Sequence, residues 1–342
     1  MGAMRLDATL VLAVAAATGV ALAAAPAPAA ARPVSAVATT GTSAATQVST
    51  ATQASTATRA AAGAPAATVD ATYHVWTWNV AGWAIHRGST TDGLITVLTN
   101  SIRNRAADFA ALNELCWSQY KAVQANLRDS GWPQDVLNFS RFEPHNSTGC
   151  GGEPFGLAIF SKAPLGTADR YALADDGTSE TRKLLCAPLS DRPHLRFCTT
   201  HLTPWDPDFN TAQLNQVLSY VESYNAAGDT VIIAGDFNAQ PSYGRLDSWY
   251  SPSVNTTYNS GNRGAYRELD DTDTRCIGYG ENTVADGDGP CGPGKKIDLI
   301  FVRENRLVGT YDGDSLDISD SCGGPCSDHR ITIGTVTVAV TS

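Results

Sequence analysis

The sequence predicts an α/β protein in which two mixed β-sheets pack face to face and helices cover them on the outside. Three observations carry this prediction. Short apolar strands are interspersed with amphipathic helices, several neighbouring strands are linked as hairpins, and no internal repeat is visible. From Tyr73 to the end of the chain no low-complexity segment interrupts the sequence, and this length is enough for one large core.

Each element has a local signal. Tyr73–Val80 is enriched in Val, Trp and Tyr and is predicted to be a strand. In Thr211–Ala227 apolar residues recur every three or four positions until Gly228, which predicts a helix. Further strands are predicted at Asp108–Leu112, Phe155–Ser161, Lys183–Leu189, Leu195–Leu202, Val231–Ala234, Lys296–Val302 and Ile331–Val340, and further helices at Thr91–Ala106 and Ser118–Ser130. Residues 251–294 are rich in Gly, Asn, Thr and Asp and are predicted to form a long surface excursion.

Two segments precede the predicted domain. Residues 1–33 are typical of an export signal, with Arg5, an apolar stretch from Leu10 to Ala25 and small residues after it. A membrane anchor is the alternative, but the Ala-rich run and its Ala-Ala-Ala sequence suit signal peptidase. Residues 34–70 are an Ala/Thr/Ser-rich segment that we expect to be disordered, because it has too little apolar surface to bury. The predicted domain is therefore 71–342, and we expect a secreted, extracellular protein without a transmembrane segment.

The chain is acidic, with a formal net charge of −10. Such a protein attracts polyanions poorly through its general field. Carboxylates that gather around a divalent metal would locally reverse the field that a phosphate meets. The charge therefore weakens a nucleic-acid interpretation without excluding it.

Eight cysteines in an exported chain predict four disulfides. A hairpin centred on residue 192 places Cys186 opposite Cys198, and only Gly-Gly-Pro separates Cys322 from Cys326 within a small loop. Proximity and elimination then pair Cys276 with Cys291 and Cys116 with Cys150. A zinc site is the competing interpretation, but no pair has Cys-x₂-Cys spacing.

Polar groups interrupt apolar strands at six places. The interruptions are Asn79, Asn113-Glu114, His201, Asp236 with Asn238, Asp298, and Asp328-His329. A buried carboxylate is costly unless a metal, a cation or several hydrogen bonds compensate it. Any one of these groups alone is more simply a turn cap or a surface acid, but six together at strand ends indicate a site. Oxygen and amide ligands without cysteine favour Mg²⁺, Mn²⁺ or Ca²⁺ over zinc.

The order Trp-Asn-Val, Asn-Glu, Thr-His-Leu, Gly-Asp-Phe-Asn, Ile-Asp-Leu-Ile and Ser-Asp-His resembles the endonuclease/exonuclease/phosphatase superfamily, which is deoxyribonuclease I-like. The resemblance spans Asn79 to His329 and suggests a secreted bacterial member. It implies a four-layer α/β/β/α sandwich of two packed mixed sheets, with the active site at one edge of the sheets.

The resemblance also implies roles for single residues. Glu114, Asn79 and Asp328 would bind or place the metal, which we expect to be Mg²⁺. Asp236 and Asn238 would orient the attacking water and the scissile phosphate.

The remaining roles concern the histidines and their partners. Asp298 would hydrogen-bond His329 and favour its imidazolium form, and His201 would bind or protonate phosphate oxygens. Arg182 would hold the phosphate, and Glu153 would be the acid partner of His201. The sequence leaves open whether the His329–Asp298 pair or Asp236 is the general base.

At several positions the chain differs from the residues that are usual in particular subgroups of this superfamily. Position 81 is Ala, where exonuclease III-type enzymes have Asp and deoxyribonuclease I has Arg. Cys116 stands where deoxyribonuclease I has a minor-groove arginine, and Phe237 replaces the Met that is usual in bacterial sphingomyelinases.

Other polar and aromatic residues match no motif. We expect His74, His86, His145 and His194 to be structural or exposed, and Lys295-Lys296 to form a solvated edge. Trp205, four residues after His201, is the tryptophan best placed for substrate contact.

The sequence thus predicts a secreted, divalent-metal-dependent phosphoesterase, a nuclease or phosphodiesterase that hydrolyses P–O bonds by metal-assisted water attack. A sphingomyelinase-type phospholipid phosphodiesterase is the alternative within hydrolysis, and it would need an apolar hairpin for membrane docking. A non-catalytic binding or toxin-like effector domain is the alternative of another class. The expected partner is nucleic acid or another phosphodiester substrate. We expect a monomer without a stable protein partner.

Overall fold

The computed structural model describes residues 67–342, apart from the side chains of residues 285, 286 and 288. The predicted export signal at 1–33 lies outside the described residues. So does all but the end of the segment at 34–70. The first strand, β1 (Thr68–Asn79), begins before the boundary expected from composition, because Thr68–Asp70 pair with the C-terminal strand β14 (Ile331–Thr341). No helix within the described residues is long and apolar enough to cross a membrane.

Two six-stranded sheets carry the fold. The first has the strand order β13-β14-β1-β2-β4-β3, and the second β5-β6-β7-β8-β12-β9. Their other strands are β2 (Phe109–Cys116), β3 (Ser140–Cys150), β4 (Glu153–Ser161), β5 (Asp169–Ala172), β6 (Lys183–Pro188), β7 (Leu195–His201), β8 (Thr230–Asp236), β9 (Tyr266–Glu268), β12 (Asp298–Arg303) and β13 (Asp312–Leu316). Among the strands of these two sheets in residues 67–342, only β1·β2 and β7·β8 pair in parallel, so both sheets are mixed.

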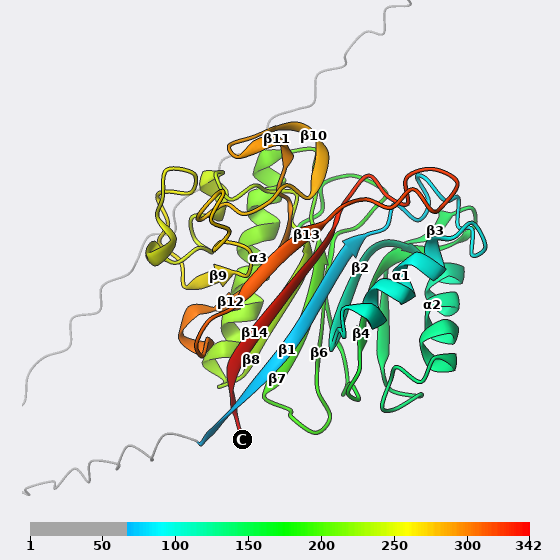
Figure 1. Cartoon of the computed structure of the whole chain (residues 1–342), viewed down its shortest axis with the longest axis horizontal. Coiled ribbons are helices and arrows are strands. Elements are labelled where there is room, and N and C mark those ends of the chain that lie inside the picture. The colour runs from blue at the N-terminus through cyan, green and yellow to red at the C-terminus, as the bar shows by residue number, and fades with distance from the viewer. Residues whose placement is uncertain (1–66) are drawn as a thin grey trace, which may run out of the picture. The chain divides into compact units, whose positions relative to one another are not determined.

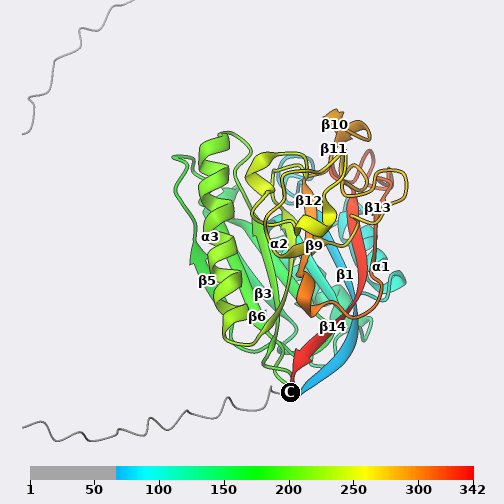
Figure 2. The ribbon, with the colours of Figure 1, turned by 90° about the vertical axis from the view of Figure 1, so that its left-hand side faces the viewer.

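The helices cover the outer faces of these sheets. On one side α1 (Leu94–Asn104) and α2 (Trp117–Asp129) pack on the first sheet, and on the other side α3 (Pro207–Ala226) packs on the second (Figures 1 and 2). Short 3₁₀ turns lie at Gly244–Leu246 (η1), Pro252–Val254 and Glu304–Arg306. The four-layer α/β/β/α sandwich of two packed mixed sheets is confirmed.

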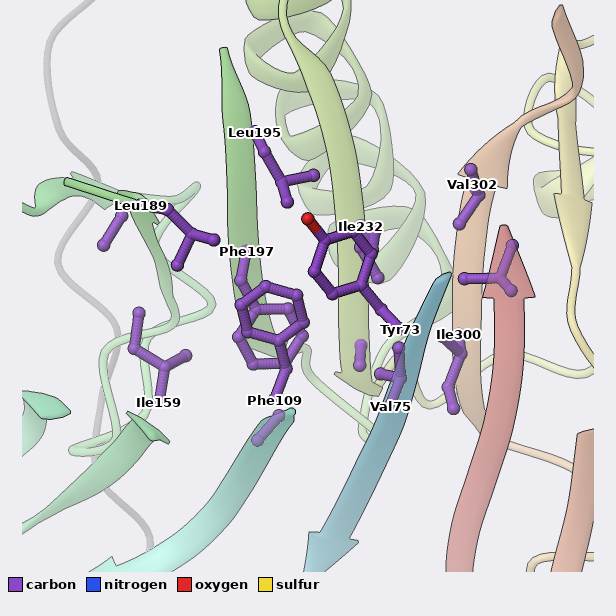
Figure 3. Packing of buried hydrophobic residues seen from close by; sticks show 14 of the residues in the cluster. Tyr73, Val75, Phe109, Ile159, Leu189, Leu195, Phe197, Ile232, Ile300 and Val302 are labelled. Atoms are coloured by element: carbon purple, nitrogen blue, oxygen red, sulfur yellow. The ribbon is translucent and has the colours of Figure 1, made fainter. Parts of the chain in front are cut away.

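Apolar side chains from both sheets interdigitate to form the central core. Phe109 of β2 stacks on Phe197 of β7, with 4.7 Å between ring centroids, and Tyr73 packs beside Phe109 (Figure 3). Ile232 and Ile300 extend the same cluster, which is buried throughout. Burial of apolar surface at about 25 cal/mol per Å² makes this layer the main source of stability.

The strands that could not be predicted from the sequence lack an apolar run. β3 reads Ser-Arg-Phe-Glu-Pro-His-Asn-Ser-Thr-Gly-Cys, and its pairing with β4 shifts register twice. The predicted surface excursion at 251–294 is wrong in its middle, because β9 pairs with β12 and buries Tyr266 and Glu268. Farther along, β10 (Val284–Gly289) and β11 (Gly292–Lys295) form a separate hairpin, at the top of Figure 1. The four predicted disulfides are all present.

One buried amide ties the two sheets together at the edge where the parallel strands end. Asn113 of β2 accepts a hydrogen bond from the backbone N–H of Asp236 at 2.9 Å. Its Nδ2 donates to the carbonyl of Thr200 at 3.2 Å. Asn113 is fully buried, so no water can replace either partner. The carboxyl ends of β1, β2, β7 and β8 are therefore held at one edge.

Replacement of Asn113 by Leu, which has a similar size, should lower the free energy of unfolding by about 2–4 kcal/mol. The reason is that a buried donor and a buried acceptor lose their partners. Urea denaturation measures the change, and the exposed Asn100→Leu on α1 serves as control, with an expected change below about 0.5 kcal/mol. An unfolding midpoint of Asn113→Leu equal to that of the wild type would contradict this role of Asn113.

Candidate active site

The first sheet contributes an amide and a carboxylate. Asn79 ends β1, and its Nδ2 donates to Glu114 Oε1 at 3.0 Å and to Asp236 Oδ2 at 3.1 Å. Glu114 lies where the pairing of β2 with β4 shifts register, between Leu112 and Leu115. This bulge turns the Glu114 side chain toward Asn79 instead of leaving it in the regular alternation of the strand. The Asn79 amide thus joins carboxylates from two different sheets.

Backbone strain gathers at the same place. Glu114, Ala81 and Asn238 have φ values of 58°, 47° and 48°, in the left-handed region that residues other than glycine rarely adopt. Such conformations cost about 1–3 kcal/mol each and persist only where the surrounding structure fixes them. Three of the five such non-glycine residues in 67–342 lie at this edge, which is typical of a functional site.

The second sheet contributes three polar residues side by side. His201 at the end of β7 is in register with Asp236 of β8, which is in register with Asp298 of β12. His201 Nε2 lies 3.6 Å from Asp236 Oδ2 and 3.9 Å from Glu114 Oε1. The predicted residues from β1, β2, β7, β8 and β12 are therefore brought together.

His329 and Asp298 form the closest ion pair of this group. His329 Nδ1 lies 2.8 Å from Asp298 Oδ2, which leaves Nε2 directed toward Asp236 Oδ2 at 3.8 Å. Burial lowers the pKa of His329, but the charges of Asp298, Asp236 and Asp328 outweigh it and raise the pKa to about 10. His329 is therefore an imidazolium at neutral pH.

The loop before β14 holds this pair in place. Ser327 Oγ donates to the Asn79 carbonyl at 2.7 Å and accepts from the His329 N–H at 3.0 Å. Asp328 is exposed at the mouth of the site. The Ser-Asp-His motif thus uses its serine to attach the loop to β1, which directs Asp328 outward and His329 inward.

Two carboxylates of the site are harder to ionise than usual. Burial raises the pKa of Asp236, the Asp298 charge raises it further, and His329 and His201 offset part of the increase. Burial also raises the pKa of Glu114, against the opposing effects of His201 and Asn79. Asp236 Oδ1 nevertheless accepts the Asn238 N–H at 2.9 Å, and Asn238 Nδ2 donates to the Leu202 carbonyl.

The acid partner of His201 is Glu180, and the prediction of Glu153 for this position is wrong. His201 Nδ1 lies 3.2 Å from Glu180 Oε1. Glu153 instead accepts from the backbone N–H and the hydroxyl of Ser118 at the start of α2. Burial lowers the pKa of His201, but Glu180 outweighs it, and the net pKa is raised.

Glu180 is shared by three donors. Arg182 approaches Glu180 Oε1 to 2.8 Å, and His145 Nδ1 lies 3.2 Å from the same oxygen. Burial alone would raise the pKa of Glu180, but these contacts, with those of His201, hold the pKa well below its usual value. Arg182 is buried, and Asp176 lies on its other side at 3.6 Å.

His145 is a member of this network that no motif signalled. Burial lowers its pKa to about 4, so it is neutral and its Nδ1–H donates to Glu180. The ring stacks on His201 with 5.8 Å between centroids and 27° between the ring planes. The only sequence signal for Glu180 was its place two residues before Arg182. The expectation that Lys296 is solvated is also wrong, because Lys296 is fully buried against Glu268 and Asp270.

The donor set at this edge fits a divalent cation. Five carboxylates (Glu114, Glu180, Asp236, Asp298 and Asp328) lie around one guanidinium and three imidazoles, one of them the neutral His145, so negative charge is in excess. Asp298 Oδ1 is buried without a hydrogen-bond partner among the described residues. Glu114 and Asp328 offer hard oxygen ligands at the open side. The cluster of His145, Glu180 and His201 is a poorer cation site, because the Arg182 guanidinium already lies within it.

Comparison with known proteins agrees with this geometry. The sequence profile described as "Endonuclease/Exonuclease/phosphatase family" matches residues 76–329, most of the chain. The chain belongs to this family. The family consists of phosphoester hydrolases of nuclease and phosphatase type that usually use a divalent metal. No curated protein sequence matches the chain.

Solved structures of the family share the fold, which is deoxyribonuclease I-like. The human Nocturnin catalytic domain with bound sulfate is 17% identical, with a TM-score of 0.56 over 80% of this chain and 97% of that one. Truncated Caenorhabditis elegans TDP2 is 16% identical, with a TM-score of 0.53 over 78% and 97%. A family protein from Bacteroides thetaiotaomicron is 14% identical, with a TM-score of 0.55 over 79% and 98%. At these identities the similarity shows the fold.

Replacement of Glu180 by Gln should lower the pKa of His201 by more than about one unit, because burial remains while the compensating charge is removed. NMR titration of His201 in metal-free protein measures this change. Glu153→Gln is the matched control and should leave the titration unaltered. The opposite pattern, with only Glu153→Gln lowering the pKa, would restore Glu153 as the partner of His201.

Proposed function

We propose that the chain is a divalent-metal-dependent phosphodiesterase, most like a nuclease, that hydrolyses a P–O bond with water. One observation carries the proposal. The His329–Asp298 pair faces Asp236, and the Asn79 amide links Asp236 to Glu114 across the two sheets. Phosphodiester hydrolysis needs a positioned water, neutralised phosphoryl oxygens and help for the leaving group, and this constellation has groups suited to each need.

Glu114, Asn79 and Asp328 would hold the ion, for which Mg²⁺ is the best match and Mn²⁺ or Ca²⁺ alternatives. When bound, the ion neutralises charge on the phosphoryl oxygens and polarises the P–O bond. His201 at the end of β7 and His329 in the loop before β14 add two imidazoles whose pKa values are raised. Their protonated forms suit hydrogen bonds to phosphoryl oxygens.

The proton-transfer role falls to Asp236. In the metal-free protein the His329 pKa of about 10 favours the imidazolium, which cannot accept a proton. Asp236 has a raised pKa, as a general base near neutral pH requires, and its Oδ2 is oriented by Asn79. Asn238 then positions the substrate, and the deeply buried Arg182 acts through Glu180 and not on the phosphate directly.

One exposed aromatic side chain, Trp205, favours nucleic acid as the substrate class, although the net negative charge of the chain does not. Trp205 is 76% exposed in the loop after β7, and exposed aromatic rings stack on bases. The phospholipid alternative requires an apolar hairpin. The hairpin bonded next to His329 reads Val-Ala-Asp-Gly-Asp-Gly and Gly-Pro-Gly-Lys (Figure 1), which offers little to a membrane. A non-catalytic role would not explain the backbone strain at this edge or the burial of several carboxylates, both of which cost free energy.

The setting is proposed to be extracellular. Four disulfides suit an oxidising compartment, and residues 1–33 have the composition of an export signal. The catalytic domain would be residues 71–342, extended by the strand residues from Thr68.

The test is turnover of plasmid DNA, RNA, sphingomyelin and bis(p-nitrophenyl) phosphate by the purified oxidised protein, with Mg²⁺ and with EDTA. His329→Ala and Asp236→Ala should each lose two to four decades in rate, as is typical for acid–base groups. His194→Ala is the matched control, because His194 also pairs with an aspartate (Asp229 at 2.7 Å), but at the start of β7 and β8.

Nucleic acid cleavage that needs Mg²⁺ and both site residues is the expected outcome. Turnover that resists EDTA, or equal rates for His329→Ala and His194→Ala, would refute the proposed function. Turnover of sphingomyelin with intact DNA and RNA would assign the lipid branch instead.

A further inference from the structure

Arg245 lies beside the site and has no role in the chemistry described above. It belongs to the 3₁₀ turn η1, seven residues after Asn238. One of its terminal nitrogens donates to the Asn238 carbonyl at 3.0 Å. Its guanidinium also stacks on the Tyr243 ring, 4.4 Å from the ring centroid. The Tyr243 hydroxyl is itself fixed by a 2.8 Å hydrogen bond from Gln240, so the guanidinium rests on a held surface.

The charge of Arg245 is uncompensated. Among the side chains that the structure describes, no carboxylate oxygen lies within 4.0 Å of its guanidinium, although the chain has 34 acidic residues against 24 Lys and Arg. Arg182, by contrast, has Glu180 and Asp176. The Arg245 Nε is buried and has no hydrogen-bond partner among the described residues, and burial lowers the pKa of the side chain. A partly desolvated guanidinium without a counter-ion is unfavourable, and an anionic ligand would relieve that cost.

We propose that Arg245 binds a phosphate next to the scissile one, so that the site takes a nucleic acid strand with at least two consecutive phosphates. The inference rests on the proposed phosphodiesterase function and adds a substrate subsite to it. Asn238 separates Arg245 from Asp236, which places the guanidinium one step outside the hydrolytic centre. Tyr243 covers one face of the guanidinium, and one terminal nitrogen bonds to the Asn238 carbonyl. The other terminal nitrogen has no hydrogen-bond partner among the described residues and is the group left for a phosphate oxygen.

The test compares Arg245→Gln with Arg306→Gln. Gln keeps a donor for the Asn238 carbonyl and removes the charge. Arg306 is the matched control, because it too is half-buried and bonds only to backbone carbonyls, those of Gly228 and Asp229 at the opposite end of β8. Calorimetry in EDTA gives the dissociation constants of the thymidine dinucleotide, with one phosphate, and trinucleotide, with two. Turnover of bis(p-nitrophenyl) phosphate with Mg²⁺ is measured separately.

The wild type and Arg306→Gln should bind the trinucleotide about tenfold more tightly than the dinucleotide, and Arg245→Gln should lose that preference. Arg245→Lys should keep part of it, because the charge remains. Turnover of the small substrate should be the same in all four proteins, which also shows that the variants fold. A preference that survives in Arg245→Gln, or is absent in the wild type, would overturn the Arg245 subsite while leaving the phosphodiesterase function intact. If no substrate is turned over, but the wild type prefers the trinucleotide and Arg245→Gln abolishes this preference, the proposed function is refuted and the Arg245 subsite is supported.

Discussion

The hydrogen bonds of Asn113 set the relation between the two sheets, and the rest of the site depends on them. Its amide accepts from Asp236 N–H and donates to the Thr200 carbonyl, so one buried side chain of the first sheet fixes two adjacent strands of the second. A general apolar interface would allow the sheets to slide, because the hydrophobic effect has no direction. With the strands fixed, Asn79 reaches Glu114 and Asp236 together.

Burial of the carboxylates in this site costs free energy, and this cost explains why each of them has a partner. Asp236 and Asp298 are fully or almost fully buried, and each is stabilised by a partner from a different element: Asn79 for the first and His329 for the second. The His201–Glu180 contact repeats the same arrangement on the other side of Asp236. A hydrolytic centre gains from such a preorganised set, because charges and dipoles already point to where charge develops in the transition state.

The sequence predicts best what is encoded locally. The buried strands β1, β2, β7 and β8 have apolar runs that end in a polar group, and both features can be read without a structure. α3 begins at Pro207, earlier than Thr211, because Asp206 caps it, a signal that lies ahead of the apolar stripe. β3 and β9 could not be predicted in this way, because one is polar along much of its length and the other has three residues.

Long-range pairing explains the errors at the site. Glu153 and Glu180 are both acids near a strand, and only the tertiary path brings the second one to His201. Bonds from Thr181 to the His145 carbonyl attach that loop to β3, a strand the sequence did not reveal. The burial of Lys296 was not predicted for the same reason, since its partners Glu268 and Asp270 come from a segment that composition assigns to the surface.

We propose above that the excess negative charge at this edge forms a divalent-metal site that both sheets create. Calorimetric titration of Mg²⁺ into the metal-free protein tests it most directly, with Glu114→Gln as the variant and Glu153→Gln as the control. We expect one Mg²⁺ per chain for the wild type and for Glu153→Gln, and a loss of at least about tenfold in affinity for Glu114→Gln. Equal Mg²⁺ affinity in Glu114→Gln and the wild type, or no binding by the wild type, would contradict it.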